Sequence, residues 1–133
     1  MYLLDTNVIS AVRRPDRAPQ VAAWLRAKSE ADLFLSVITL GEIERGIRAQ
    51  ERQNPEFAAD LRIWVDRTVR LFSDRLLPFG ADEALIWGRL SQDIGHGGAD
   101  LMIAATALAR GATVVTGNVD DFRPTGVGIE NPF

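Results

Sequence analysis

The chain begins with Met1-Tyr2-Leu3-Leu4-Asp5, followed by Thr6-Asn7. A short apolar run that ends in an acid predicts a strand buried on both faces, which delivers Asp5 at its carboxyl end. Thr6 or Asn7 can then cap a short helix that continues to about Arg13. Similar apolar runs predict further strands at residues 33–37, 76–79 and 112–116, with a candidate fifth strand at 127–130.

Between these runs, apolar residues recur at helical spacing and predict helices over residues 20–29, 39–53, 56–72, 81–92 and 99–110. Thr39 is the expected cap of the second of these, with Glu42 as its capping-box partner. Leu85, Ile86 and Leu90 are expected to face inward from the fourth helix. Residues 117–124 are expected to form a polar loop.

Alternating strands and helices indicate an α/β fold, in which helices cover both faces of a central sheet. We therefore expect a three-layer α/β/α domain with a mostly parallel sheet of four to five strands. The length of 133 residues fits one domain, spanning residues 1–133.

Composition excludes several kinds of chemistry. The chain has no cysteine and one histidine, His96, so disulfides, iron–sulfur clusters, cysteine-bound zinc and sites that need two histidines are ruled out. No stretch without a charged residue is long enough to span a bilayer, and Asp5 lies too early for a secretory signal peptide. We expect a cytoplasmic protein with no membrane contact. The net charge of −3 argues against a protein that coats nucleic acid.

Acidic and amide side chains follow the expected strands. Asp5 ends the first strand, Glu42 follows the second, Asp100 opens the most apolar helix, and Asn118 and Asp121 follow the fourth strand. Each alone has an ordinary explanation as a cap or turn residue. Together they would meet beyond the carboxyl ends of the strands and repel one another, unless a divalent cation lay between them. Oxygen ligands suit Mg²⁺ or Mn²⁺, which points to phosphodiester hydrolysis by metal-activated water.

Four motifs in this order carry a resemblance to a known family. They are the segments Leu3–Ser10, Ser36–Ile43, Asp100–Ala107 and Thr116–Phe122. They resemble the motifs of PIN domains, and more narrowly those of the ribonuclease toxins of VapBC toxin–antitoxin modules, including the FitB-like branch. The match extends over essentially the whole chain, so the resemblance implies a PIN-like domain.

The resemblance implies roles for particular residues. Asp5 and Asp100 become the principal Mg²⁺ ligands, Glu42 completes the ligand set or holds a water, and Asp121 joins them in the catalytic set. At the fourth acidic position of the family this chain has Asn118, which brings no charge, so Asp121 would supply the missing carboxylate. With asparagine in place of an acid at position 118, the site could hold either one metal ion or two. Polar positions lining the site would orient the carboxylates or a phosphate, namely Thr6, Asn7, Thr116 and Asn118.

The implied function is that of a Mg²⁺-dependent endoribonuclease, with Mn²⁺ as a substitute, acting as the toxin of a type II toxin–antitoxin module. The implied partners are RNA as substrate and a VapB-type antitoxin that inserts a basic side chain into the acidic pocket. A homodimer is expected, with a heterotetramer or larger assembly when the antitoxin is bound, and with DNA contacted only through the antitoxin.

Two other classes of function stay open at this point. A phosphotransfer or phosphatase domain could use a similar acidic Mg²⁺ pocket, but haloacid-dehalogenase-type phosphatases need a second aspartate at the position of Asn7. Receiver domains need a late lysine, and the only lysine is Lys28. The second class is a non-catalytic PIN-like module whose acids are helix caps and which only binds a partner. Metal affinity separates the enzyme from this module.

Overall fold

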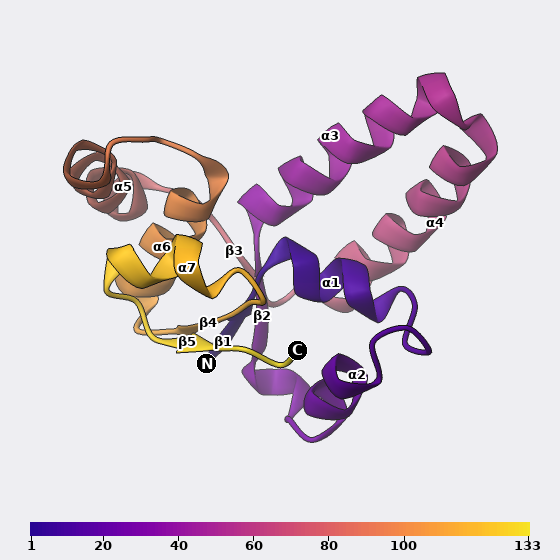
Figure 1. Ribbon diagram of the computed structural model, residues 1–133, viewed down its shortest axis with the longest axis horizontal. Coiled ribbons are helices and arrows are strands. Elements are labelled where there is room, and N and C mark those ends of the chain that lie inside the picture. Colours follow the sequence, from indigo (N-terminus) through magenta and orange to yellow (C-terminus); the bar gives the residue numbers. More distant parts are fainter.

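The computed structural model describes residues 1–133 and contains a five-stranded sheet with the strand order β3-β2-β1-β4-β5. Every neighbouring pair of strands is parallel, which confirms the fold expected from the sequence (Figure 1). The strands are β1 (Tyr2–Leu4), β2 (Leu33–Ser36), β3 (Leu76–Leu77), β4 (Thr113–Val115) and β5 (Ile129–Glu130).

Helices cover both faces of the sheet, as Figure 1 shows. One layer holds α1 (Thr6–Val12), α2 (Pro19–Arg26), α3 (Val37–Gln53) and α4 (Pro55–Leu71). The other holds α5 (Ala81–Ile94), α6 (Ala99–Arg110) and α7 (Val119–Phe122), and two short 3₁₀ helices lie at Glu30–Asp32 and Arg123–Thr125. None of the helices combines the length and the apolar character needed to cross a membrane.

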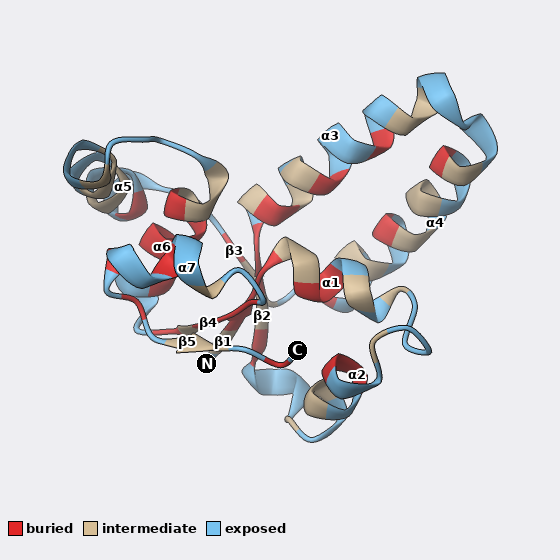
Figure 2. Cartoon of the chain, in the orientation of Figure 1, coloured by how far each residue is buried: buried red, intermediate tan, exposed pale blue.

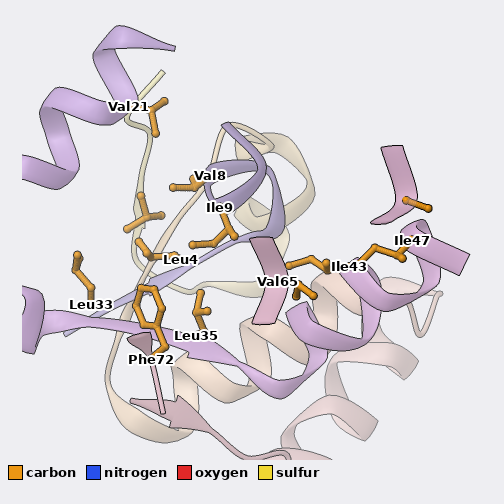
Figure 3. Close-up of a cluster of buried hydrophobic side chains, with 12 residues drawn as sticks. Leu4, Val8, Ile9, Val21, Leu33, Leu35, Ile43, Ile47, Val65 and Phe72 are labelled. Carbon is orange, nitrogen blue, oxygen red and sulfur yellow. The ribbon is translucent and has the colours of Figure 1, made fainter. Parts of the chain in front are cut away.

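Side chains of adjacent strand residues point to opposite faces of the sheet and so build two separate cores. In β1, Leu4 joins the core under α1 to α4, whereas Leu3 joins the core under α6 and α7. In the neighbouring strand β4, Val115 joins the first of these cores and Val114 joins the second. Figure 3 shows the first of these cores, and Figure 2 shows that buried residues concentrate in the sheet and on the inward faces of the helices.

Helix α6 is the most buried helix, as its apolar sequence predicts. Six of its residues are buried, among them Leu101 and Ile103. The helix ends at Gly111, whose φ of 66° is a left-handed conformation that glycine adopts without strain. This firm packing fixes the start of α6, and therefore the position of Asp100 in its first turn.

Three local predictions were wrong. Helix α3 begins at Val37, and its cap is Ser36, whose Oγ accepts a hydrogen bond of 3.0 Å from the Ile38 amide. Thr39 is instead fully buried, with no hydrogen-bond partner for its hydroxyl group. The expected loop at residues 117–124 contains helix α7. Leu85 faces solvent with 63% of its surface exposed, because the buried face of α5 is centred on Glu83.

Candidate active site

Asp5 is the most buried acid at the carboxyl edge of the sheet. It follows β1 directly and is only 2% exposed. Its Oδ1 accepts a hydrogen bond of 2.8 Å from the Thr6 amide, so Asp5 itself caps α1, and the prediction of Thr6 or Asn7 as the cap was wrong. Its Oδ2 accepts a second bond of 2.7 Å from the Thr116 hydroxyl group. Both oxygens are therefore held in one orientation.

Thr116 links the end of β4 to the start of α1. This residue is fully buried, and its hydroxyl group donates a hydrogen bond to Asp5. The same oxygen accepts a bond of 2.9 Å from the Asn118 amide and a bond of 3.3 Å from Nδ2 of Asn7. The Oδ1 atom of Asn7 in turn accepts from the Gly117 amide at 3.4 Å. Thr6, Asn7, Thr116 and Asn118 therefore all lie beside Asp5 or its hydrogen-bond partners, as expected for polar residues that orient it.

Glu42 lies in the second turn of α3 and points toward α1. Its Oε1 accepts a hydrogen bond of 2.8 Å from the Thr6 hydroxyl group, and the side chain is half-buried. Glu42 was expected to be the capping-box partner of Thr39. It does not have this role, because α3 starts two residues before Thr39. Residue Thr6 therefore contacts two acids, through its amide and its hydroxyl group.

Asp100 lies in the first turn of α6, after the cap residue Gly98, and no hydrogen bond to its side chain contributes to its pKa. Burial and the neighbouring charges of Asp5, Asp121 and Glu42 raise the pKa of Asp100 to about 6, with a smaller opposing effect of His96. His96 itself is exposed, and its Nδ1 accepts a bond of 3.2 Å from the Gly98 amide.

The pKa of Asp5 is also raised. Burial is the main cause, the hydrogen bonds from Thr116 and Thr6 act in the opposite direction, and the charges of Glu42 and Asp121 raise the pKa further. Asp5 and Asp100 therefore each feel the charges of Glu42 and Asp121, which come from two other parts of the chain. All six salt bridges of the chain lie elsewhere, so no arginine or lysine is paired with a carboxylate of this cluster.

Asp121 and Asn118 lie at the rim of the site. Asn118 precedes α7, and the Asp121 amide donates a hydrogen bond of 3.2 Å to its carbonyl oxygen. Both side chains are exposed and line a polar hollow of about 400 Å³ together with Asn131. Asp121 contributes charge to the cluster, and Asn118 contributes only an amide at this rim.

The residues of this edge fit a Mg²⁺ ion. The available donors are carboxylate, hydroxyl and amide oxygens, which are the ligands of hard cations. No group of three acidic or histidine side chains is arranged to enclose a metal ion. A Mg²⁺ ion here would be held by one or two carboxylates and would keep several of its waters, as Mg²⁺ typically does in proteins. Such a cation would relieve the repulsion between these partly buried carboxylates.

A second feature adjoins the acids and was not singled out by the sequence patterns. Thr6 and Glu42 lie at one end of a groove of about 290 Å³ between α1, α3 and α4, with Ser10, Arg13 and Gly46 further along it. The helical spacing of Thr6, Ser10 and Arg13 is the sequence signal that could have indicated a shared face.

A parallel five-stranded sheet with an uncompensated acidic cluster at its carboxyl edge defines the class of this protein. The family model of the PIN domain matches residues 2–126, and the chain belongs to this family.

Individual relatives agree with this assignment. Toxin FitB of Neisseria gonorrhoeae is 35% identical over 138 residues, which cover 100% of this chain and 99% of FitB. Ribonuclease VapC14 of Mycobacterium tuberculosis is 50% identical over 72 residues, which are 53% of this chain and 70% of that protein. The crystal structure of FitAcB from Neisseria gonorrhoeae aligns with a TM-score of 0.86 at 34% identity, covering 99% of this chain and 98% of that one. The resemblance to VapC and FitB toxins drawn from the four motifs is thereby confirmed.

Proposed function

We propose that this protein is a Mg²⁺-dependent endoribonuclease and the toxin of a type II toxin–antitoxin module. The observation that carries the proposal is the cluster of Asp5, Glu42, Asp100 and Asp121 at the edge of a PIN domain, with no arginine or lysine paired with any of these acids. The proposal is supported by relatives that are a ribonuclease and a toxin.

In this proposal Asp5 and Asp100 hold the cation. When bound, Mg²⁺ would neutralise charge on the phosphodiester and lower the pKa of a bound water, so that water can attack phosphorus near neutral pH. Asp5 suits this role because Thr6 and Thr116 fix both of its oxygens. Asp100 suits it because burial and neighbouring charges, and no hydrogen bond, set its pKa, so its carboxylate is free for another ligand.

The remaining polar residues orient groups or carry protons. Oε1 of Glu42 accepts a hydrogen bond from the Thr6 hydroxyl group, which leaves Oε2 to hold a water. Asp121, at the exposed rim, is the carboxylate that can accept a proton from a water, whereas the amide of Asn118 cannot act as a base. Asn7 and Thr116 keep the end of β4 aligned with the start of α1.

The proposed partner is a VapB-type antitoxin that places an arginine or lysine in the acidic pocket. A cationic side chain there would replace Mg²⁺ and relieve the same repulsion between carboxylates. We further propose a homodimer that becomes a heterotetramer or larger assembly with the antitoxin. DNA would be contacted through the antitoxin, since this chain has a net charge of −3.

The test is cleavage of purified total RNA by the antitoxin-free protein, with Mg²⁺ or Mn²⁺ compared with EDTA. An Asp100→Ala variant, checked for folding by circular dichroism, exposes contaminating nuclease. Metal-dependent cleavage that is lost in this variant is the expected result.

Isothermal titration with Mn²⁺ separates the enzyme from a non-catalytic module. A protein that binds no Mn²⁺ and cleaves no RNA would contradict the proposal and favour a module that only binds a partner. If the protein binds Mn²⁺ but cleaves nothing in total RNA, cleavage of a random-sequence RNA pool is measured next. Failure to cleave this pool also contradicts the proposal.

A further inference from the structure

The groove between α1, α3 and α4 starts at the acidic cluster and leads away from it. In Figure 1, α1 lies between the sheet and the long pair formed by α3 and α4. Thr6 and Glu42, which are hydrogen-bonded to each other, belong both to the acidic site and to the lining of this groove. A polymer bound across the acids would therefore have this groove beside the bond that is cleaved.

Each of the three helices presents one face to the groove. Thr6, Ser10 and Arg13 follow one another along α1 at helical spacing, and they span about 10 Å. The opposite wall is formed by Glu42, Gly46 and Gln50 of α3. Apolar side chains from α3 and α4 complete the lining, among them Ile43, Leu61 and Trp64. The groove is thus apolar inside, polar along both walls, and anionic only at the end that meets the acidic site.

Arg13 is the only cation that lines the groove, and it lies at the end away from the acids. Its guanidinium group stacks on the ring of Phe57, with 5.1 Å to the ring centroid. It makes no salt bridge within the chain. A stacked guanidinium keeps its N–H edge free, and this edge matches the geometry of a phosphate group.

We propose that this groove binds the nucleotide that adjoins the cleaved bond in single-stranded RNA, with Arg13 contacting the next phosphate. The inference rests on the proposed ribonuclease function. The cation at Asp5 and Asp100 and the guanidinium of Arg13 would then hold two successive anionic groups of one strand, one at each end of the groove. The apolar interior takes the face of a base or sugar.

The shape of the groove favours a single strand. Its volume of about 290 Å³ is at the lower end for ligand pockets, which begin at about 300 Å³. A base that is still paired and stacked in a duplex cannot enter a pocket of this size, whereas an unstacked base can.

Gly46 provides a sharp test, because a side chain added there would project into open space. No atom lies within 4 Å of the position that its Cβ would take. Replacing a glycine inside a helix by leucine also favours the helix. Gly46→Leu should therefore fill the groove without harming the fold. The matched control is Gly88→Leu in α5, because Gly88 also lies inside a helix with open space at Cβ.

The experiment compares two substrates in the presence of Mn²⁺. The first is a random-sequence pool of single-stranded RNA, and the second is bis(p-nitrophenyl) phosphate, which is too short to reach along the groove. Gly46→Leu should lower kcat/KM on RNA at least tenfold and leave turnover of the small phosphodiester unchanged. Gly88→Leu should change neither. Equal kcat/KM on RNA for Gly46→Leu and the wild type would overturn the inference.

Arg13→Gln tests the phosphate contact separately. Binding of the same RNA pool is measured at several salt concentrations in an Asp100→Asn background, which prevents cleavage. Loss of one phosphate contact to a single strand should reduce the slope of log affinity against log salt by about 0.7. Arg89→Gln on α5, an exposed arginine without a salt bridge, should leave the slope unchanged.

The outcomes distinguish this inference from the proposed function. If the wild type cleaves neither substrate, the ribonuclease proposal fails and this inference fails with it. If the wild type cleaves RNA and the groove variants match it, only this inference fails. Loss of antitoxin binding in Gly46→Leu, with unchanged RNA cleavage, would assign the groove to a peptide and overturn the RNA inference.

Discussion

The Thr116 hydroxyl group donates a hydrogen bond of 2.7 Å to Oδ2 of Asp5, so the residue that follows β4 orients the carboxylate that follows β1. The two residues are 111 positions apart in the chain and meet because β1 and β4 are neighbours in the sheet. This bond stabilises the charged form of Asp5 and opposes the effect of burial on its pKa. The sheet thereby keeps a buried carboxylate available for a cation.

Thr116→Val removes this hydrogen bond and nearly preserves side-chain shape. We expect the pKa of Asp5 to rise further and Mn²⁺ affinity to fall about 10- to 100-fold, the usual effect of losing a partner that orients a metal ligand. Isothermal titration measures the affinity. Thr106→Val is the control, because Thr106 is equally buried and its hydroxyl group bonds to the Met102 carbonyl oxygen, within α6. Equal affinities in the two variants would show that Thr116 does not act through Asp5.

Much of this edge could be predicted from the sequence, because each acid follows a recognisable apolar segment. Asp5 follows the apolar run that becomes β1, and Asp100 precedes the uncharged run that becomes α6. Parallel strands bring their carboxyl ends to one edge, so the meeting of these residues follows from the strand prediction.

The sequence pattern does not decide where a helix begins or which of its faces is buried when two residues or two faces are equally suitable. Ser36 and Thr39 are both good helix caps, and only the burial of Thr39 inside the fold decides between them. Helix α7 is four residues long, with Asp120 and Asp121 in its first turn, and such a short helix has no periodicity to recognise. Leu85 breaks the expected pattern because α5 buries Glu83, which pairs with Arg110 at 3.6 Å.

The raised pKa of Asp100 predicts a pH dependence of metal binding. The carboxylate must be ionised to bind a cation, and its pKa is raised from 3.8 to about 6 in the metal-free protein. Mn²⁺ affinity should therefore fall by up to about tenfold per pH unit below pH 6. Titrations at several pH values measure this dependence. A flat affinity between pH 7 and pH 5 would contradict the assignment of Asp100 as a ligand.

The same shift predicts how the stability of the metal-free protein depends on pH. Between pH 3.8 and about pH 6 the folded state binds the Asp100 proton more tightly than the unfolded state does, so this group's contribution to stability decreases as pH rises through that range. Asp100→Asn should be more stable than the wild type at pH 7, and this advantage should shrink toward pH 4. Urea unfolding at each pH measures the difference. A wild type as stable as Asp100→Asn at pH 7 would argue against repulsion at this site.

Asn118→Asp adds a carboxylate at the rim of the acidic site, where the resemblance to the PIN family implies a fourth acid. The Asn118 side chain makes no capping hydrogen bond, so the change removes no contact that holds α7. A carboxylate added at the rim of the site contributes about 1 to 2 kcal/mol to the binding of a divalent ion even with the screening of water, so Mn²⁺ affinity should rise about 5- to 30-fold. The control is Asn54→Asp, the same change at the cap of α4, where Asn54 accepts a bond of 3.1 Å from the Phe57 amide. A gain in both variants would indicate a general charge effect rather than a ligand at Asn118.

Trp24 and Trp87 differ in hydrogen bonding, so replacing each of them should change the free energy of unfolding by a different amount. Its Nε1 donates a hydrogen bond of 2.8 Å to Oε1 of Glu130, which ties α2 to β5, whereas the buried Nε1 of Trp87 has no partner. Trp24→Phe should lower the free energy of unfolding by about 1.5 to 3 kcal/mol, the usual value of a hydrogen bond to a charged group. Trp87→Phe should lower the free energy of unfolding by less. It loses ring contacts, but it also removes a buried N–H group that has no partner and is costly to keep away from water. Urea unfolding of both variants measures the difference, and an equal loss in the two would mean that ring packing, not the bond to Glu130, holds Trp24.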